Sequence, residues 1–232
     1  MTARAHWKEL CMDTTGGEQL GRFWADLLDL EFQPDSEDGN VVGSQEGHGI
    51  AMCRVPEQKS VKHRVHIDVY AGSVEDVVRR GATVVLPAEE SGFPWTVMRD
   101  PEGGEFCVFR RDPVPDQKFF QLVVDALDAR EIAGWWGEVF DAEPIGHNSP
   151  ENSPDWWSLE GVPGMPYERL TFGQVPEPKT VKNRIHWDLY ADVEDMVGAG
   201  ATVLRARDDE IRWNVMADPE GNEFCVFDRI GA

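Results

Sequence analysis

The chain has 232 residues, 41% of them hydrophobic, and its 43 acidic side chains against 22 basic ones give a formal net charge of −21 at pH 7. So acidic a chain, without a basic stripe, repels nucleic-acid phosphates and anionic membrane surfaces. No apolar run approaches the roughly 18 residues of a membrane-spanning helix, and the N-terminal residues lack the apolar core of a signal peptide, so we expect a cytoplasmic protein that binds neither nucleic acid nor membranes.

The first stretch of the chain reads as one strand, one helix and three short strands. Residues 6–13 have the character of a strand, and residues 16–30 place their large apolar side chains at helical spacing. A short segment at 31–33, a polar turn, and the runs at 41–45 and 49–55 then predict strands separated by turns. The predicted order is therefore β-α-β-β-β.

The same order follows a second time. Residues 64–71 predict a strand, and residues 73–81 predict a helix with Ser73 as its N-cap and Gly81 at its end. Three more strands are expected in ATVVL, PWTVMRD and GEFCVFR, with a tight turn at Asp100–Gly103 before the last. Each half of the chain would thus contain two β-α-β-β-β units.

The second half of the chain repeats the first. WTVMRDPEGGEFCVFRR at 95–111 returns as WNVMADPEGNEFCVFDR at 213–229, and VPEQKSVKHRVHIDVYA at 55–71 returns as VPEPKTVKNRIHWDLYA at 175–191. A copy of about 115 residues has the size of a small domain. We predict modules at 1–112 and 118–232 joined by a linker at 113–117, with helices at Asp128–Val139 and Val193–Ala199 in the second module.

The cysteines do not suggest a disulfide framework. Cys107 and Cys225 occupy the same place in the repeated EFCVF strand, Cys11 and Cys53 lie apart from them, and there is no CxxC. Equivalent positions in separate modules rarely form a bridge, and the expected compartment is reducing.

Strand alternation places the polar side chains of the repeat on one face. In RVHIDVY the apolar residues Val65, Ile67 and Val69 should lie under the helix, which turns the residues between them to the opposite side. The same parity applies to EFCVF and to the second copy. The residues predicted for this polar face are His66, Asp68, Tyr70, Glu105, Cys107 and Phe109, with His186, Asp188, Tyr190, Glu223, Cys225 and Phe227 in the second copy. If that face curls into a cup, it is a ligand site.

Several motifs together resemble the vicinal oxygen chelate superfamily, which includes glyoxalase I, the extradiol dioxygenases and the bleomycin and fosfomycin resistance proteins. They are a helix with an aromatic doublet, a strand that opens with His, and the segments VPEPKTVKNRIHWDL and DPEGNEFCVF with their equivalents in the first copy. The chain looks like a glyoxalase/bleomycin-resistance-like protein with two tandem glyoxalase-like domains. The resemblance implies an α+β fold in which two βαβββ units form a curved, cup-shaped mixed sheet with helices on its outer face, and a monomer of fused modules or a homodimer.

The resemblance also implies where a metal would bind, and here the sequence departs from the family. Metal-dependent relatives carry His or Gln on the first strand, Glu on the fourth, His on the fifth and Glu on the eighth. His66 and His186 match the fifth-strand ligand, but the eighth-strand position holds Cys107 or Cys225, with Glu105 or Glu223 two residues earlier. That displacement is about 6–7 Å along the strand.

Two metal sets remain conceivable. The second copy could offer Gln121, Glu168, His186 and Glu223 for Zn, Ni, Fe or Mn, and the first could offer Glu9, His48, His66 and Glu105. The fourth-strand position could instead fall on Met52 and Phe172. Because the eighth-strand carboxylate is displaced, we favour no metal cofactor.

The leading functional hypothesis is therefore a metal-independent protein that holds an apolar or aromatic metabolite or antibiotic in an aromatic-lined cup. Residues 153–166 are rich in proline and are expected to form a loop, in which Trp156 and Trp157 could stack on a flat ligand or could simply be packed. The candidate ligand-binding residues are His66, Asp68, Tyr70, Glu105, Cys107, Gln121, Trp156, Trp157, His186, Asp188, Tyr190, Glu223 and Cys225.

Two enzymatic alternatives stay open. One is a divalent-metal lyase, isomerase or dioxygenase that acts on a small carbonyl or aromatic substrate. The other is a metal-free enzyme in which His186 and Glu223 serve as acid and base.

Overall fold

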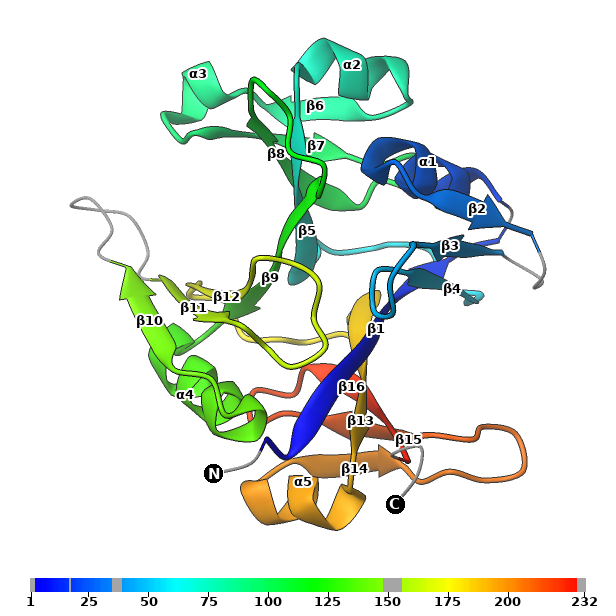
Figure 1. Ribbon diagram of the computed structural model, residues 1–232, viewed down its shortest axis with the longest axis vertical. Helices are drawn as coiled ribbons and strands as arrows, with labels where there is room; N and C mark the ends of the chain where they lie inside the picture. Colours follow the sequence, from blue (N-terminus) through cyan, green and yellow to red (C-terminus); the bar gives the residue numbers. More distant parts are fainter. Residues whose placement is uncertain (1–2, 17, 35–38, 148–155, 229–232) are drawn as a thin grey trace.

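The computed structural model describes residues 3–16, 18–34, 39–147 and 156–228. These residues form two eight-stranded mixed sheets with short helices on the outer sides (Figure 1). The α+β class and the tandem β-α-β-β-β units predicted from the sequence are confirmed. No helix in the described ranges is long and apolar enough to span a membrane.

The first sheet, called sheet A, has the strand order β14-β15-β16-β13-β1-β4-β3-β2. Its strands are β1 (Ala5–Thr14), β2 (Glu31–Gln33), β3 (Asn40–Val42), β4 (Ile50–Arg54), β13 (Ile185–Ala191), β14 (Thr202–Arg205), β15 (Asn214–Ala217) and β16 (Glu223–Phe227). The second sheet, called sheet B, has the order β10-β11-β12-β9-β5-β8-β7-β6. Its strands are β5 (Val65–Ala71), β6 (Thr83–Leu86), β7 (Trp95–Arg99), β8 (Glu105–Arg110), β9 (Phe119–Ala126), β10 (Pro144–His147), β11 (Trp156–Glu160) and β12 (Arg169–Gln174).

Each sheet contains two β-α-β-β-β units, but the two units come from different sequence copies. In sheet A, β1 of the first copy pairs antiparallel with β13 of the second, from Ala5 opposite Ala191 to Met12 opposite Ile185. In sheet B, β5 of the first copy pairs with β9 of the second. Figure 1 shows the first of these pairings as the dark-blue β1 beside the orange β13. The two units of one copy therefore lie on different sheets, which decides the composition of both cups.

The helices bury aromatic side chains against the backs of the sheets. They are α1 (Gln19–Leu28), α2 (Val74–Arg79), α3 (Ala88–Ser91), α4 (Ala129–Phe140) and α5 (Val193–Ala199). Trp24 of α1 and Trp136 of α4 are buried, and Trp136 meets Trp187 and Phe224 edge-on with ring centroids 5.2 Å away from each. Trp187 is thus on the helix side of β13.

Local signals explain where the helices begin and end. Ser73 caps α2 as predicted, since its Oγ accepts from the Asp76 N–H at 3.1 Å, and Gly81 has a φ of 117° that suits only glycine. The short helix α3 has no counterpart in the sequence-based prediction.

The segment around Trp156 and Trp157 corrects the sequence analysis. We expected residues 153–166 to form a loop, yet Trp156–Glu160 is the strand β11, paired antiparallel with both β10 and β12. The prolines flank this strand and do not interrupt it, so its ladder is complete. Residues 153–155 of the predicted loop lie outside the described residues.

Candidate functional site

Each sheet carries a cluster of a histidine, an aspartate and a cysteine on its polar face. His66, Asp68 and Cys107 in sheet B have ligand atoms within 4.8 Å of one another, and His186, Asp188 and Cys225 do the same in sheet A. The strand register explains the grouping, because Asp68 lies opposite Cys107 and Asp188 opposite Cys225. The structure therefore brings together the side chains that strand alternation places on this face.

In sheet B the buried Asp68 is held by a chain of two hydrogen bonds through Gln121 and Thr171, which belong to the first unit of the second copy. Gln121 Nε2 donates to Asp68 Oδ2 at 2.6 Å, and Thr171 Oγ1 donates to Gln121 Oε1 at 2.8 Å. His66 Nε2 lies 3.5 Å from Asp68 Oδ1, an oxygen that has no hydrogen-bond partner among the described residues. Burial raises the pKa of Asp68. A carboxylate with one free buried oxygen is a ready partner for a polar group of a ligand.

Aromatic rings line one end of this face. Tyr70 stacks on Phe120 with ring centroids 4.6 Å apart, Phe109 meets Phe120 edge-on at 5.1 Å, and Trp95 lies 5.3 Å from Phe109. Arg169 covers Phe120, with its guanidinium carbon 5.3 Å from the ring centroid.

Tyr70 reaches from this cluster to the neighbouring loop. Its hydroxyl donates to Glu168 Oε1 at 3.0 Å, and burial raises its pKa to about 12. The phenol therefore stays protonated and acts as a fixed donor to Glu168.

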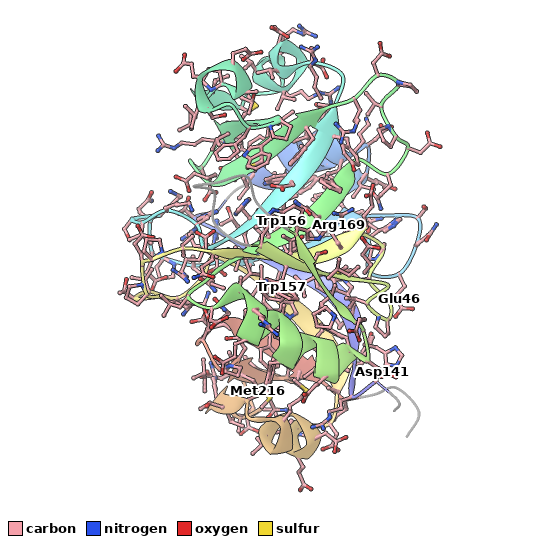
Figure 2. The ribbon with its side chains drawn as sticks, turned by 90° about the vertical axis from the view of Figure 1, so that its left-hand side faces the viewer. Glu46, Asp141, Trp156, Trp157, Arg169 and Met216 are labelled. Atoms are coloured by element: carbon pink, nitrogen blue, oxygen red, sulfur yellow. The ribbon has the colours of Figure 1, made fainter. Side chains whose placement is uncertain are left out.

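The opposite end of the face carries an aromatic stack on the edge strands. Trp156 stacks on His147 with ring centroids 3.7 Å apart, and His147 Nε2 lies 2.8 Å from Ser158 Oγ. Trp156 and Arg169 belong to the paired strands β11 and β12 and are labelled near each other in Figure 2. Burial lowers the pKa of His147, and the nearby Arg169 lowers it further.

Trp157 points the other way. Arg130 of α4 lies over its ring at 5.5 Å from the centroid, and the ring packs against the main core. Of the two tryptophans proposed as ligand contacts, the structure thus places Trp156 on the polar face and Trp157 on the helix side.

The polar face of sheet A is less aromatic and contains more charge. Tyr190 and Phe227 occupy the places of Tyr70 and Phe109, but Lys8 stands where sheet B has Phe120, and its Nζ lies 4.4 Å from the Phe227 ring centroid. The same Nζ lies 3.6 Å from Asp188 Oδ2.

Burial perturbs the two central titratable groups of sheet A in opposite directions. Burial lowers the pKa of His186 to about 3 and raises that of Asp188 to about 6. His186 Nδ1 and Asp188 Oδ1 have no hydrogen-bond partner in the described part of the chain. His186 is therefore neutral at pH 7, and the cluster has two unfilled bonding positions.

Glu105 and Glu223, both candidate site residues, are committed to structural bonds. Glu223 accepts from Lys179 Nζ at 2.6 Å and from the Asn183 backbone N–H at 3.1 Å. Glu105 does the same with Lys59 and the backbone of His63. Neither glutamate belongs to the His–Asp–Cys clusters. The assignment of His186 and Glu223 as acid and base stays a prediction, with both oxygens of Glu223 already bonded to other residues.

The metal sets considered from the sequence are split between the two sheets. Gln121 and Glu168 lie with β9 and β12 of sheet B, whereas His186 and Glu223 lie on sheet A. The first-copy set is divided in the same way, with Glu9 on sheet A and His66 and Glu105 on sheet B, because the units pair across copies.

The fourth strand of each cup, β4 in sheet A and β12 in sheet B, turns no carboxylate or histidine toward the place where the family binds its metal. The inward residues of β4 are Ala51 and Cys53, and those of β12 include Thr171 and Gly173. The side-chain oxygen of Gln121 is already bonded to Thr171. The residues present do not fit that metal centre.

Sequence reasoning missed two residues of the polar face of sheet A. Cys11 lies opposite His186, and Cys53 lies opposite Asp13 on the next strand, so both share the face of the His186 cluster. The period-two alternation of β1 could have placed Cys11, but only the cross-copy pairing shows which histidine it meets.

A pocket of about 810 Å³ lies between the two equivalent loops that precede β5 and β13. Its lysines are neutralised: Lys62 pairs with Asp125 at 2.7 Å, and Lys182 pairs with Asp13. Arg64 donates to the backbone carbonyls of Asp125 on β9 and of Glu177 in the opposite loop. These ion pairs and hydrogen bonds connect the two sequence copies, and they leave few unpaired positive charges in the pocket for a phosphate ligand.

Comparison with known proteins agrees with this architecture. The family model described as "Glyoxalase-like domain" matches twice, at residues 9–109 and 121–227. No curated protein matches the sequence. Among solved structures, glyoxalase I from Zea mays is similar with a TM-score of 0.69 and 12% identity over 97% of this chain and 92% of that one.

A proposed dioxygenase from Bacillus subtilis subsp. subtilis str. 168 is similar with a TM-score of 0.62 and 13% identity, over 100% of this chain and 87% of that one. At such identities the likeness to the solved structures concerns the fold. The family assignment rests on the two domain matches, which together cover most of the sequence. The chain therefore belongs to the glyoxalase-like domain family of the vicinal oxygen chelate superfamily, as a tandem of two such domains.

Proposed function

We propose that this protein binds an apolar or aromatic small molecule, a metabolite or an antibiotic, on the concave face of sheet B, and that it needs no metal ion to do so. The observation that carries this proposal is the arrangement of that face. Aromatic side chains lie at both of its ends, around a polar row formed by His66 and the buried Asp68 and Gln121. Ligand sites typically combine such apolar walls with a few placed polar groups.

The two ends of the face offer different contacts to a ring. Trp156 of β11, backed by His147 of β10, presents an indole at one end, and Tyr70 and Phe120 of the central strands β5 and β9 present a second stack at the other. Between them, Asp68 Oδ1 is free to bond a ligand hydroxyl or amine. A flat molecule with one polar substituent satisfies both requirements.

The metal-dependent alternative has less support from the site. Glyoxalase I is the name of one neighbour, but that similarity is at 12% identity. The residue sets expected within each copy lie on different sheets, and β4 and β12 turn neither a carboxylate nor a histidine into their cups. We therefore assign no reaction step to a metal ion in this cup.

A ligand screen tests the proposal. Chelator-treated protein is screened by thermal shift against flat aromatic metabolites and aromatic antibiotics, and the strongest compound is titrated by tryptophan fluorescence. We expect Trp156→Ala to weaken its binding about 10-fold or more, because the variant loses an aromatic contact and its buried area. Asp68→Asn should weaken only compounds that carry a polar substituent.

The matched control is Trp157→Phe, which changes the neighbouring ring on the helix side and should leave affinity unchanged. Binding that disappears after chelator treatment and returns with a divalent ion would favour the metal-dependent alternative. Silence from the whole panel, or equal affinity in wild type and Trp156→Ala, would reject the binding site in sheet B.

A further inference from the structure

Arg169 is a mostly buried cation on the polar face of sheet B, and its guanidinium makes no hydrogen bond with any residue that the structure describes. Its Nε is buried and has no partner. The nearest carboxylates, those of Glu160 and Glu168, lie 3.6 Å and 3.9 Å from its Nη2, beyond hydrogen-bonding distance. About half of each glutamate side chain is exposed, and exposed ion pairs of this kind contribute little to stability. The N–H donors of Arg169 are therefore available to a ligand.

The guanidinium of Arg169 lies between the aromatic groups at the two ends of this face. Its carbon is 5.3 Å from the ring centroid of Phe120. Burial lowers the pKa of His147, and the charge of Arg169 lowers it further, while the ring of His147 stacks on Trp156. An arginine that covers an aromatic ring keeps the donors in its own plane free for a carboxylate. The cation is thus held in place by an aromatic contact and not by hydrogen bonds.

Strand register puts Arg169 in one row with the open carboxyl oxygen of the cup. Arg169 on β12 lies opposite Gln121 on β9, and Gln121 lies opposite Asp68 on β5. Residues opposite each other point to the same side of a sheet, and two strand spacings separate the backbones of Arg169 and Asp68 by about 9–10 Å. Asp68 Oδ1 has no hydrogen-bond partner within the described ranges. The row therefore offers a cation at one end and an acceptor at the other.

Sheet A carries the same row with a different charge. Glu9 lies opposite Asp188, so a carboxylate stands where sheet B has the amide of Gln121. The residue in the place of Arg169 is Gly49, which directly precedes the paired residues of β4. Both differences make the row of sheet B more positive than that of sheet A, so only sheet B is suited to an anionic ligand.

We infer, on the basis of the binding function proposed for this face, that the ligand of sheet B is an aromatic carboxylate with a hydroxyl group at its opposite end. The carboxylate accepts two parallel N–H bonds from the planar guanidinium of Arg169, a geometry that matches both groups. The hydroxyl donates to Asp68 Oδ1. The ring between them lies over Gln121 and beside the Tyr70 and Phe120 stack.

Calorimetric titration of the chelator-treated full chain with matched probes tests the assignment. The probes are para-hydroxybenzoate and para-hydroxycinnamate, each compared with its uncharged carboxamide. The acids should bind about 10-fold more tightly than the carboxamides, because hydrogen bonds to a charged group are the stronger ones. Arg169→Gln should reduce the acids to the affinity of the carboxamides. Arg169→Lys should keep part of the preference, since it retains the charge without the planar fork.

Arg130→Gln is the matched control, because Arg130 also covers a tryptophan ring, that of Trp157, but on the helix side. It removes the same charge and should leave the preference for the acids unchanged. A preference that persists in Arg169→Gln, or that disappears in Arg130→Gln, would overturn the inference.

Wild-type protein alone separates this inference from the function on which it rests. Equal affinity for acids and carboxamides would overturn the anionic ligand and leave aromatic binding intact. Binding of neutral aromatic compounds, with no binding of either acid, would have the same meaning. Silence from the acids, the carboxamides and the neutral compounds alike would reject both the ligand class and the binding function.

Discussion

The carboxylate of the Asp100 turn gives a sharp test of how burial acts in this fold. Asp100 begins the repeated DPEG turn and is 6% exposed. Its Oδ1 accepts the backbone N–H groups of Glu102 at 2.9 Å and Gly104 at 2.8 Å. Asp100→Asn keeps this oxygen and therefore both bonds, but removes the charge from a buried position.

The magnitude follows from the pKa. Burial raises the pKa of Asp100 from 3.8 to about 6, which corresponds to about 3 kcal/mol. Because the folded pKa lies above the unfolded one, this contribution to stability is complete below about pH 3.8 and is lost as the pH rises through about 6. Asp100→Asn has no carboxyl group to ionise, so its free energy of unfolding does not fall in this pH range. The variant should match wild type near pH 4 and exceed its free energy of unfolding by up to about 3 kcal/mol at pH 7.

The equivalent Asp218 should behave differently although it occupies the same turn. Its Oδ2 accepts from Trp136 Nε1 at 3.2 Å and from Asn222 Nδ2 at 3.0 Å. The corresponding indole of the first copy, Trp24 Nε1, has no partner within the described residues. An amide NH₂ at position 218 would face two donors, so Asp218→Asn should lose about 2 kcal/mol or more at either pH.

Urea denaturation of both variants and wild type at about pH 4 and pH 7 measures these differences. If the advantage of Asp100→Asn fails to grow with pH, the carboxyl is not held protonated by burial and the reasoning is refuted. If Asp218→Asn is as well tolerated as Asp100→Asn, the contrast between the two turns is wrong.

Three further substitutions test the core packing, an ion pair and a helix N-cap that position the cups. Chemical denaturation measures the free energy of unfolding of each variant. Trp136→Ala should lower the free energy of unfolding by about 3–5 kcal/mol, because the indole is fully buried among Trp187, Phe140 and Phe224; a loss under about 1 kcal/mol would contradict this core. Lys179→Met should cost about 3 kcal/mol at pH 7 by leaving the buried Glu223 without its cation, and an unchanged stability would mean that the pair is solvated. Asp128→Ala should cost about 1 kcal/mol through the lost N-cap bond to the Glu131 N–H at 2.9 Å, with the exposed Glu138→Ala as a neutral reference.

Local rules account for the parts of the site that the sequence could predict. Strand alternation has a period of two and depends only on neighbouring residues, so it places His66, Asp68 and Cys107 on one face without knowledge of the fold. Helices α4 and α5 follow in the same way from apolar spacing and from caps at Asp128 and Asp192.

The sequence could not show which units share a sheet. The strands IHWDLYA and VHIDVYA carry nearly the same pattern, so neither identifies the copy whose first strand will pair with it. The strand assignment of Trp156 failed for a related reason. The strand β11 forms because it pairs with β10 and β12, partners that are distant in sequence, whereas the flanking prolines favour a loop in a local prediction.

The cross-copy pairing gives the duplication a specific consequence. The second units keep the repeated HxD and EFCVF strands, and each supplies the same His–Asp–Cys cluster to its sheet. The first units have diverged and are exchanged between the copies. The first copy therefore brings Lys8, Cys11 and Cys53 to sheet A, while the second brings Phe120 and Trp156 to sheet B. The difference between a thiol-rich cup and an aromatic one thus resides in the first units, and exchanging residues 5–54 for their equivalents at 119–174 should transfer the ligand preference with them.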